Sequence, residues 1–441
     1  MRTSVVIVGA GPGGLAMSRE LTAAGVDHVL LERGDVGNSW RTERWDSLRL
    51  LTPNWMTALP GMQYEGDDPD GFMSAADVVR FLDAYRAHID APVQSGVAVE
   101  AAARVADGFD VHTSAGMWRA DVVVAASGGS SEPRIPALAA EIPSRVEQLS
   151  AIDYRRPEQL SAEGRVLVVG ASASGAQIAD ELAAAGRDVV LAVGEHIRLP
   201  RRYRGRDIYW WLDQIGQLDE RYDEVEDLTR ARRHASIQVV GNDEGRDLDV
   251  NALRASGVQI VGRLMAMRGA TAQFSGGLGA LVANADLKQT RMLRRIDAFV
   301  EERGLGDQVD GATDALPTRI GEVATELDLD AFSTVIWATG YRPQYKWLSR
   351  DAFDVRGRVK HDGGIGALPG LYFLGLPFLR RRRSNLLSGM GADAADLSAH
   401  MRRYLDDQAP VSARRVRSTM SSTGDSAPAR RRSVARASPS F

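Results

Sequence analysis

The fold is decided by residues 4–14, which read Ser-Val-Val-Ile-Val-Gly-Ala-Gly-Pro-Gly-Gly. The β-branched run at 4–8 is typical of a buried strand, and residues 15–22 follow with helical spacing. Gly25 ends this helix, and a second apolar run occupies 28–31. The stretch therefore predicts a strand, a glycine-rich turn, a helix and a second strand parallel to the first.

The glycines of this turn have the spacing of a dinucleotide-binding site. Gly9 allows a tight turn, Gly11 lets the backbone approach a pyrophosphate, and Gly14 lets the helix pack closely on the strand. The unpaired N–H groups at the helix start favour a phosphate. Glu32 follows Gly14 by 18 residues, close to the spacing of about 20 expected for the acid that binds a ribose. The alternative is a glycine-rich turn that only packs.

The same pattern returns later in the chain. An apolar strand is expected at 166–169, and residues 170–175 then read Gly-Ala-Ser-Ala-Ser-Gly. A helix is expected at 176–185 and another strand at 188–193. The hydroxyls of this turn can donate to phosphate oxygens while its glycines still allow the chain to turn. A second dinucleotide site is therefore predicted.

Charge suggests which nucleotide the second site takes. No acid ends its second strand, and Arg198, Arg201, Arg202 and Arg204 follow. A guanidinium binds phosphate oxygens in a bidentate manner, so these arginines favour the 2′-phosphate of NADPH over NADH. A solvated basic loop is the alternative.

Together the two units predict an α/β fold with two Rossmann-like dinucleotide-binding domains, for FAD and NADPH, the second inserted in the first. Further buried strands are expected within 109–126, 332–338 and 370–375, and a terminal helix at 389–404. The expected boundaries are 1–160 with 331–408 for the FAD domain, 161–330 for the NADPH domain, and 409–441 for a disordered basic tail.

Composition excludes several classes of protein. The chain of 441 residues has no cysteine, so disulfides, thiolate metal sites and a redox dithiol are ruled out. No apolar run approaches a membrane span, and no signal peptide is recognisable at the N-terminus. The net charge of −4 divides into +6 in residues 409–441 and −10 elsewhere, which does not favour nucleic-acid binding. A cytoplasmic enzyme without a metal site is expected, because the histidines lack ligand spacing.

Two nucleotide sites without a dithiol imply that electrons pass to oxygen, a quinone, another protein or a substrate. Here the sequence resembles the class B flavin-containing monooxygenases, in particular a bacterial flavoprotein branch associated with potassium transport. The resemblance covers about residues 4–405. It is carried by the stretches 9–14, 39–41, 44–52, 153–155, 170–175, 199–207, 338–343 and 370–391.

The resemblance implies that Trp40 and Arg41 help to enclose FAD and that Thr339 and Gly340 lie where the two domains join. It suggests Asn54 as the asparagine near the flavin. The full set of predicted cofactor-binding residues is Gly9, Gly11, Gly13, Gly14, Glu32, Arg33, Trp40, Arg41, Thr52, Ser127, Gly170, Ser172, Ser174, Gly175, Arg198, Arg201, Arg202, Thr339 and Gly340.

One family fingerprint is largely absent. Its Phe, Gly and His positions are occupied by Ser144, Val146 and Ser150, and only Tyr154 matches. This weakens assignment to the main subfamily. The function implied is an FAD- and NADPH-dependent monooxygenase that inserts one oxygen of O₂ into a small organic substrate, by N-, S- or Baeyer–Villiger oxidation through a flavin C4a-(hydro)peroxide.

The alternatives are an FAD-dependent NAD(P)H reductase or oxidase that passes electrons to a quinone, a protein or O₂, and a non-enzymatic nucleotide sensor. A homodimer is left open. The aromatic stretch 208–215 is either a wall of a substrate pocket or an amphipathic helix packed in the core.

Overall fold

The computed structural model describes residues 1–233 and 235–408, so the predicted tail, 409–441, lies outside the described residues. Residues Met1–Ser398 form one compact unit. The other unit is Ala399–Phe441, and its described residues, 399–408, are helical. In the described part of the chain, no helix combines the length and apolar character needed to cross a bilayer.

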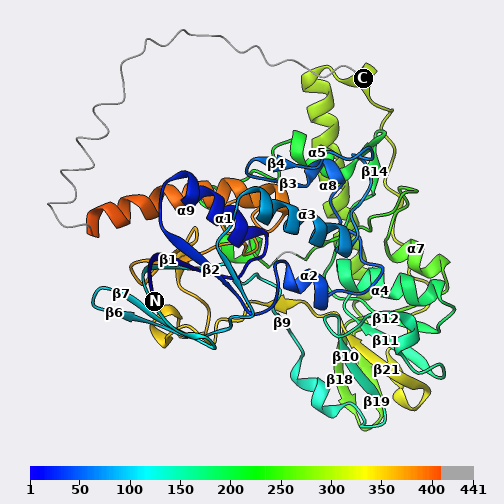
Figure 1. The fold of residues 1–441 in the computed structure, drawn as a ribbon. Helices are drawn as coiled ribbons and strands as arrows, with labels where there is room; N and C mark the ends of the chain where they lie inside the picture. Colours follow the sequence, from blue (N-terminus) through cyan, green and yellow to red (C-terminus); the bar gives the residue numbers. More distant parts are fainter. Residues whose placement is uncertain (234, 409–441) are drawn as a thin grey trace. The chain divides into compact units, whose positions relative to one another are not determined.

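The first sheet is built around the strand predicted from the opening stretch (Figure 1). Strands β25, β8, β1, β2 and β5 are parallel neighbours in that order, and β6 and β7 form an antiparallel hairpin on β8. The sheet comprises β1 (Arg2–Val8), β2 (His28–Glu32), β5 (Val93–Ser95), β6 (Val99–Val105), β7 (Gly108–Thr113), β8 (Gly116–Ala125), β23 (His361–Asp362), β24 (Ile365–Gly366) and β25 (Leu371–Phe373).

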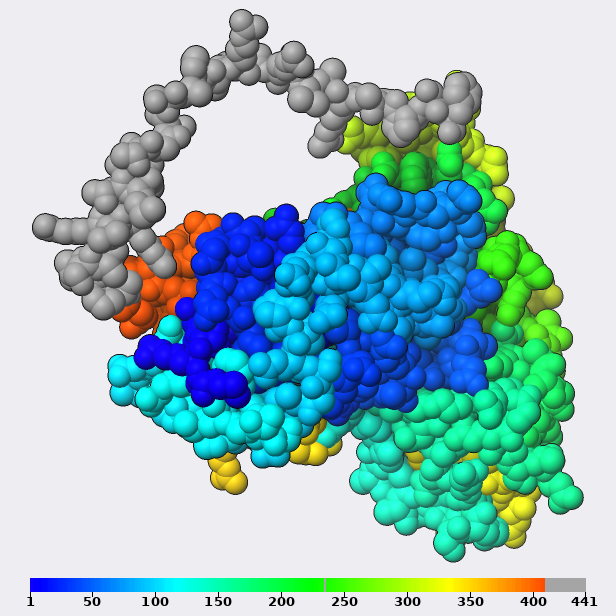
Figure 2. Space-filling view, in the orientation of Figure 1, coloured from blue at the N-terminus to red at the C-terminus, as the bar shows by residue number. Residues whose placement is uncertain are grey.

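The N-terminus is attached to this hairpin region. The amino group of Met1 donates to the carbonyl of Met117 at 3.0 Å, and the amide of Arg119 donates back to the Met1 carbonyl at 2.9 Å. Figure 2 shows the dark blue N-terminal residues lying against the cyan hairpin. Strand β1 pairs with β2 on one side and with β8 on the other, so the turn that follows it has a fixed starting point.

The second sheet is fully parallel and has the order β10-β21-β11-β12-β17. Alternate residues of β11 pack on opposite faces, as expected for a parallel strand covered on both sides. Helices α4 and α7 cover one face. The elements are β10 (Glu147–Ser150), β11 (Arg165–Val169), β12 (Val189–Ala192), β17 (Gln259–Val261), β21 (Phe332–Trp337), α4 (Ala173–Ala184) and α7 (Val250–Ala255).

Two strands, β10 and β21, lie in the second sheet, although the predicted domain boundaries place them in the FAD domain. Strands β10 and β21 were placed within 1–160 and 331–408, yet β21 pairs with β10 on one side and with β11 on the other. The chain crosses between the sheets in an antiparallel ribbon of β9 (Glu132–Pro133) and β22 (Tyr341–Arg342). We therefore propose 134–340, in place of 161–330, as the inserted domain.

The remaining helices are α1 (Pro12–Ala23), α2 (Asn38–Thr42), α3 (Ala75–His88), α5 (Ile208–Gln214), α6 (Leu228–Ala231), α8 (Leu278–Arg303) and α9 (Leu387–Gln408), with 3₁₀ turns at η1 (Asn54–Met56), η2 (Ala137–Glu141), η3 (Pro157–Gln159), η4 (Gly306–Gln308), η5 (Leu329–Ala331) and η6 (Arg350–Ala352). The remaining strands are β3 (Ala58–Leu59), β4 (Met62–Gln63), β13 (Ile197–Arg198), β14 (Arg202–Tyr203), β15 (Arg206–Asp207), β16 (Ile237–Gln238), β18 (Leu264–Arg268), β19 (Thr271–Phe274) and β20 (Glu326–Asp328).

Helix α5 decides between the two interpretations of stretch 208–215. Trp211 is fully buried, and it packs in one cluster with Leu199, Tyr203 and Ile296. Its indole N–H donates to the Tyr203 carbonyl at 2.6 Å. These contacts favour the amphipathic helix packed in the core.

Candidate functional site: two equivalent glycine-rich turns

The two glycine-rich turns have the same backbone conformation. Gly9 and Gly170 have φ of 106° and 111°, a region that favours glycine. The residues that begin the following helices, Gly11 and Ser172, have φ/ψ of −79°/−175° and −78°/−174°. The chain therefore forms one turn geometry twice, once on each sheet.

The last glycine of each turn is required by close backbone packing. A Cβ on Gly14 would lie 2.0 Å from the carbonyl oxygen of Gly9, and a Cβ on Gly175 would lie 1.8 Å from that of Gly170. Both distances are far inside van der Waals contact. The helix can approach its strand this closely only with glycine at these positions.

The first glycine of each turn lies against the residue that follows a neighbouring parallel strand, β8 in the first sheet and β21 in the second. A Cβ on Gly9 would lie 2.7 Å from the carbonyl oxygen of Ala126, and one on Gly170 would lie 2.3 Å from that of Ala338. The stretches 126–128 and 338–340 are thus structural equivalents. This places Ser127 beside the first turn and Thr339 beside the second, at the sites where the chain leaves each sheet.

The starts of both helices have donors to offer an anion. Neither α1 nor α4 has a side-chain cap, so their first backbone N–H groups have no such acceptor. A Cβ on Gly11 would meet nothing within 4 Å, which leaves the backbone open to a ligand on that side. The turns therefore fit the phosphates of a dinucleotide.

Buried polar atoms without partners lie beside both turns. The hydroxyl of Ser127 is buried and has no hydrogen-bond partner among the described residues. At the second turn, Gln238 donates to the Ala171 carbonyl at 2.5 Å, while its buried Oε1 has no partner within the same residues. Unsatisfied buried atoms are costly unless a ligand or water completes them, so both sites are consistent with bound nucleotides.

Glu32 is fixed at the end of β2. Its Oε2 accepts from the amide of Ala10 at 2.9 Å, and its Oε1 accepts from the amide of Gly34 at 3.0 Å. The carboxylate is 8% exposed and retains lone pairs on both oxygens. This is the geometry expected of an acid held in place to receive ribose hydroxyls.

The segment after β2 places Trp40 and two predicted arginines. Trp40 is half-buried in α2. Arg41 donates to the Val36 carbonyl at 3.0 Å and pairs with Asp83, and Arg33 pairs with Glu43. Their guanidinium groups are thus tied to the protein surface near α2. Thr52, further along, is buried.

Arg44 is a further candidate for nucleotide binding. The sequence indicated it only as the first residue of stretch 44–52, one of those that carry the family resemblance. Its guanidinium lies 5.2 Å from the centre of the Trp40 ring and donates to the Glu43 carbonyl at 2.8 Å. Burial lowers the pKa of Arg44, and the nearby Tyr341 opposes this shift. The phenol of Tyr341 lies 3.5 Å from the hydroxyl of Ser174 in the second turn. Arg44 therefore brings a half-buried cation towards the second turn from the first domain.

Asn54, the predicted residue near the flavin, is buried in η1. Its Nδ2 donates to the Asp68 carbonyl at 2.9 Å, and its amide N–H donates to the Gly71 carbonyl at 2.9 Å. Its Oδ1 has no partner in the described part of the chain. These bonds hold the loop 68–71, and the catalytic role of Asn54 stays a prediction.

The arginines predicted to bind a 2′-phosphate are placed differently from one another. Arg198 donates to Asp249 at 2.7 Å and to Asp286 at 2.8 Å, with its side chain 7% exposed. Arg201 is 1% exposed, pairs with Asp207 and donates to the Leu51 carbonyl at 2.8 Å. Both guanidinium groups are internal and paired with acids, Arg198 with two that are distant in sequence and Arg201 with one only six residues away.

Arg202 is exposed and donates to the Gly205 carbonyl at 3.3 Å. Among these three predicted arginines, the geometry leaves only this one open to solvent.

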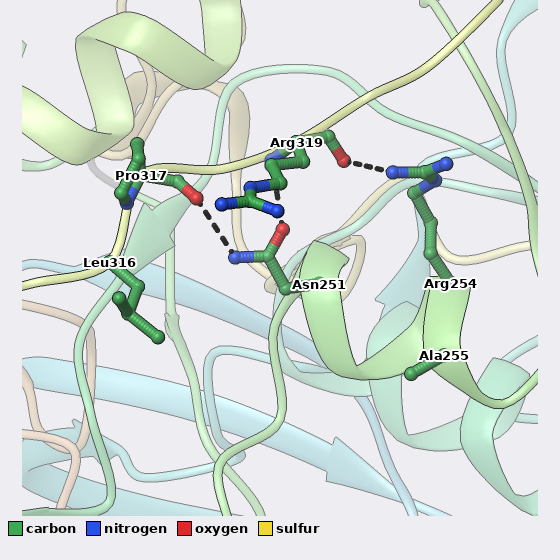
Figure 3. Close-up of a pocket in the computed structure, with 6 residues that line it drawn as sticks. All are labelled: Asn251, Arg254, Ala255, Leu316, Pro317 and Arg319. Carbon is green, nitrogen blue, oxygen red and sulfur yellow. Dashed lines mark hydrogen bonds between the residues drawn. The ribbon is translucent and has the colours of Figure 1, made fainter.

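A separate cavity of about 500 Å³ lies between α7 and the segment 316–319 (Figure 3). Asn251 links the two walls, since its Nδ2 donates to the Pro317 carbonyl at 3.1 Å and its Oδ1 accepts from the Arg319 amide at 2.8 Å. Arg254 donates to the Arg319 carbonyl at 2.5 Å. Neither glycine-rich turn contributes a residue to its lining.

Comparisons with known proteins agree with this architecture. A family model described as pyridine nucleotide-disulphide oxidoreductase matches residues 6–272. The CzcO-like oxidoreductase of Geobacillus kaustophilus is 30% identical over 393 residues, covering 88% of this chain and 95% of that protein. Indole-3-pyruvate monooxygenase YUCCA1 of Oryza sativa subsp. japonica is 31% identical over 212 residues, 45% of this chain and 50% of that protein.

The fold is similar to that of a solved flavin-containing monooxygenase from Stenotrophomonas maltophilia, with a TM-score of 0.63 and 20% identity over 92% of this chain and 99% of that one. The chain belongs to the pyridine nucleotide-disulphide oxidoreductase family, and its fold is that of the flavin monooxygenase structures. It is an oxidoreductase with the predicted α/β fold of two Rossmann-like domains. Because it has no cysteine, it cannot pass electrons through a dithiol of its own.

Proposed function

We propose that this enzyme is an FAD- and NADPH-dependent monooxygenase that transfers one oxygen atom of O₂ to a small organic substrate. The observation that carries the proposal is the repetition of one uncapped, glycine-rich turn on two sheets of a chain without cysteine. When bound, FAD supplies the two-electron chemistry between the reduced nicotinamide and O₂.

The chain's own residues bind and orient the nucleotides. In the first domain, Gly9 and Gly11 shape the turn, the start of α1 offers backbone donors to the FAD pyrophosphate, and Glu32 receives a ribose. In the second domain, Ser172 and Ser174 add hydroxyl donors at the start of α4. Trp40 and Arg44 contact each other on the segment that follows β2, and Arg44 extends from there towards the second turn.

The role of Glu32 can be tested directly. Glu32→Gln keeps the size of the side chain but replaces a charged acceptor, so FAD should bind about 10- to 100-fold more weakly. Flavin fluorescence on dialysis measures this loss. Asp35→Asn is the matched control, because Asp35 is an exposed acid three residues away. Equal flavin retention by Glu32→Gln and the wild type would remove the ribose role.

The reaction with oxygen separates the monooxygenase from the reductase or oxidase. The purified protein is reduced anaerobically by NADPH or NADH and then mixed with oxygenated buffer while the flavin spectrum and H₂O₂ are followed. A monooxygenase should return to oxidised flavin in two resolved phases, with H₂O₂ released late. Immediate H₂O₂ in a single phase supports the oxidase. That alternative is favoured by the position of Asn54, whose Nδ2 is already bonded to Asp68.

A further inference from the structure

The register of the two sheets identifies the residue that corresponds to Glu32 in the second site. In the first sheet, the amide of Gly9 donates to the Leu31 carbonyl, and Glu32 follows. In the second sheet, the amide of Gly170 donates to the Ala192 carbonyl, and Val193 follows. Val193 is fully buried. The second site therefore has an apolar side chain where the first has its ribose-binding acid, so no carboxylate there repels a 2′-phosphate.

The guanidinium of Arg263 lies at the end of β12, although Arg263 itself follows the neighbouring strand, β17. A Cβ built on Gly194, the residue after Val193, would lie 3.5 Å from Nε and 3.7 Å from Nη2 of Arg263. Arg263 follows β17 by two residues and is exposed. The guanidinium thus covers Gly194, where a side chain would otherwise stand.

Like Arg202, Arg263 has no ion-pair partner in residues 1–233 and 235–408, but of these two it is Arg263 that lies against Gly194. Arg198, Arg201 and Arg204 each pair with an aspartate. The guanidinium of Arg263 is therefore free to take an anionic ligand. Glu195 directly follows Gly194 in the sequence, and no ion pair joins it to Arg263 within the same described residues.

The backbone around Arg263 is fixed on both sides. The amide of Val193 donates to the Val261 carbonyl at 3.0 Å, which locks the two strand ends together. The amide of Ser275 donates to the Arg263 carbonyl at 2.8 Å, and a Cβ on Gly262 would lie 1.9 Å from the Ser275 carbonyl oxygen. Only glycine allows this approach, so the base of the Arg263 side chain is held beside Gly194.

We propose that Arg263 binds the 2′-phosphate of NADPH and sets the preference of this enzyme for NADPH over NADH. The cation lies just after β17, the strand beside β12, instead of in the loop that follows β12. The planar guanidinium can donate two N–H groups to phosphate oxygens. The inference rests on the proposed function, in which the second turn binds the pyridine nucleotide.

The test measures binding without turnover. The flavin-loaded protein is titrated calorimetrically with 2′,5′-ADP and with 5′-AMP, which differ by the 2′-phosphate. The wild type should bind 2′,5′-ADP more tightly, and Arg263→Ala should lower that ratio about 10- to 100-fold while binding 5′-AMP as before. Arg263→Lys should fall between them, because it keeps the charge but loses the planar fork. Arg268→Ala is the matched control, since Arg268 is exposed on β18, the next strand along the chain.

The outcomes separate this inference from the function on which it rests. If Arg263→Ala keeps the wild-type ratio, or if Arg202→Ala loses it instead, the assignment of Arg263 is wrong and the NADPH site itself stands. If the wild type binds neither probe and is reduced by neither NADPH nor NADH, the proposed function fails and the inference falls with it. Flavin content and the far-UV spectrum of each variant establish that it is folded.

Discussion

Replacing Gly14 by alanine should yield a protein that retains almost no flavin and unfolds at much lower denaturant concentration. The new Cβ would lie 2.0 Å from the carbonyl oxygen of Gly9, so α1 must move away from β1. Overpacking of this kind costs about 3 kcal/mol or more when the clash is with backbone. The displaced helix start would also lose its bonds to the pyrophosphate, so flavin affinity should fall at least about 100-fold.

Gly11→Ala provides the contrast, because it changes the ligand side of the same turn. Gly11 has φ of −79°, which alanine adopts, and its Cβ would meet nothing within 4 Å. The fold should therefore lose less than about 1 kcal/mol, the cost of alanine at a helix N-cap. Flavin should still be lost, since the methyl group occupies the space offered to the pyrophosphate. Urea unfolding of the apoproteins measures the loss of stability, and flavin absorbance measures the loss of flavin binding. Equal destabilisation by Gly14→Ala and Gly11→Ala would contradict the different roles given to these two glycines.

Arg198→Met should destabilise the protein by about 3–5 kcal/mol, the usual cost of removing one partner from a buried ion pair. The guanidinium binds Asp249 and Asp286 and donates to the Leu316 carbonyl at 2.6 Å. Without it, two largely buried carboxylates lose the cation that they share. The same substitution in the exposed pair of Arg156 and Asp46 should cost no more than about 1 kcal/mol. Urea unfolding measures both, and similar losses would show that the pair at Arg198 is not structural.

The effect of Arg198→Met should depend on pH in a defined direction. Burial raises the pKa of Asp286, but hydrogen bonds from Thr318 and Arg198 outweigh burial and lower it overall. A lowered pKa means that the charged acid stabilises the fold above its unfolded pKa of about 4 and that this contribution is lost as the pH falls. The difference in unfolding free energy between variant and wild type should therefore be largest near pH 7 and shrink at acidic pH. A difference that grows on acidification contradicts the assignment.

The elements of the two turns were predictable because each lies within one short stretch. The first unit, from Ser4 to Glu32, spans a single strand, helix and strand, and local spacing alone indicates it. The second turn followed from the same rule. The arginines were not predictable in this way, since sequence proximity brought Arg198 and Arg201 near the second turn while Asp249 and Asp207 decided their pairing.

Arg263 illustrates the opposite case. It is distant from Gly194 in sequence, and only the parallel pairing of β12 with β17 brings the two together. The strand that ends at Trp337 was predicted, but its pairing with β10 and β11 was not, because a buried apolar strand carries no information about its neighbours. Pairing partners, both of strands and of charges, are therefore what the sequence left undetermined.

The ribbon of β9 and β22 has a consequence for how this chain is assembled. Pro133 pairs with Tyr341, and the amide of Arg134 donates to the Gly340 carbonyl at 2.8 Å, so the segment between them begins and ends at one place. An inserted segment whose two ends lie next to each other disturbs the domain that contains it no more than a hairpin turn would. Residues 134–340 thus have the layout of an exchangeable module, and a short turn in their place should leave the strands of the first sheet with their pairing partners.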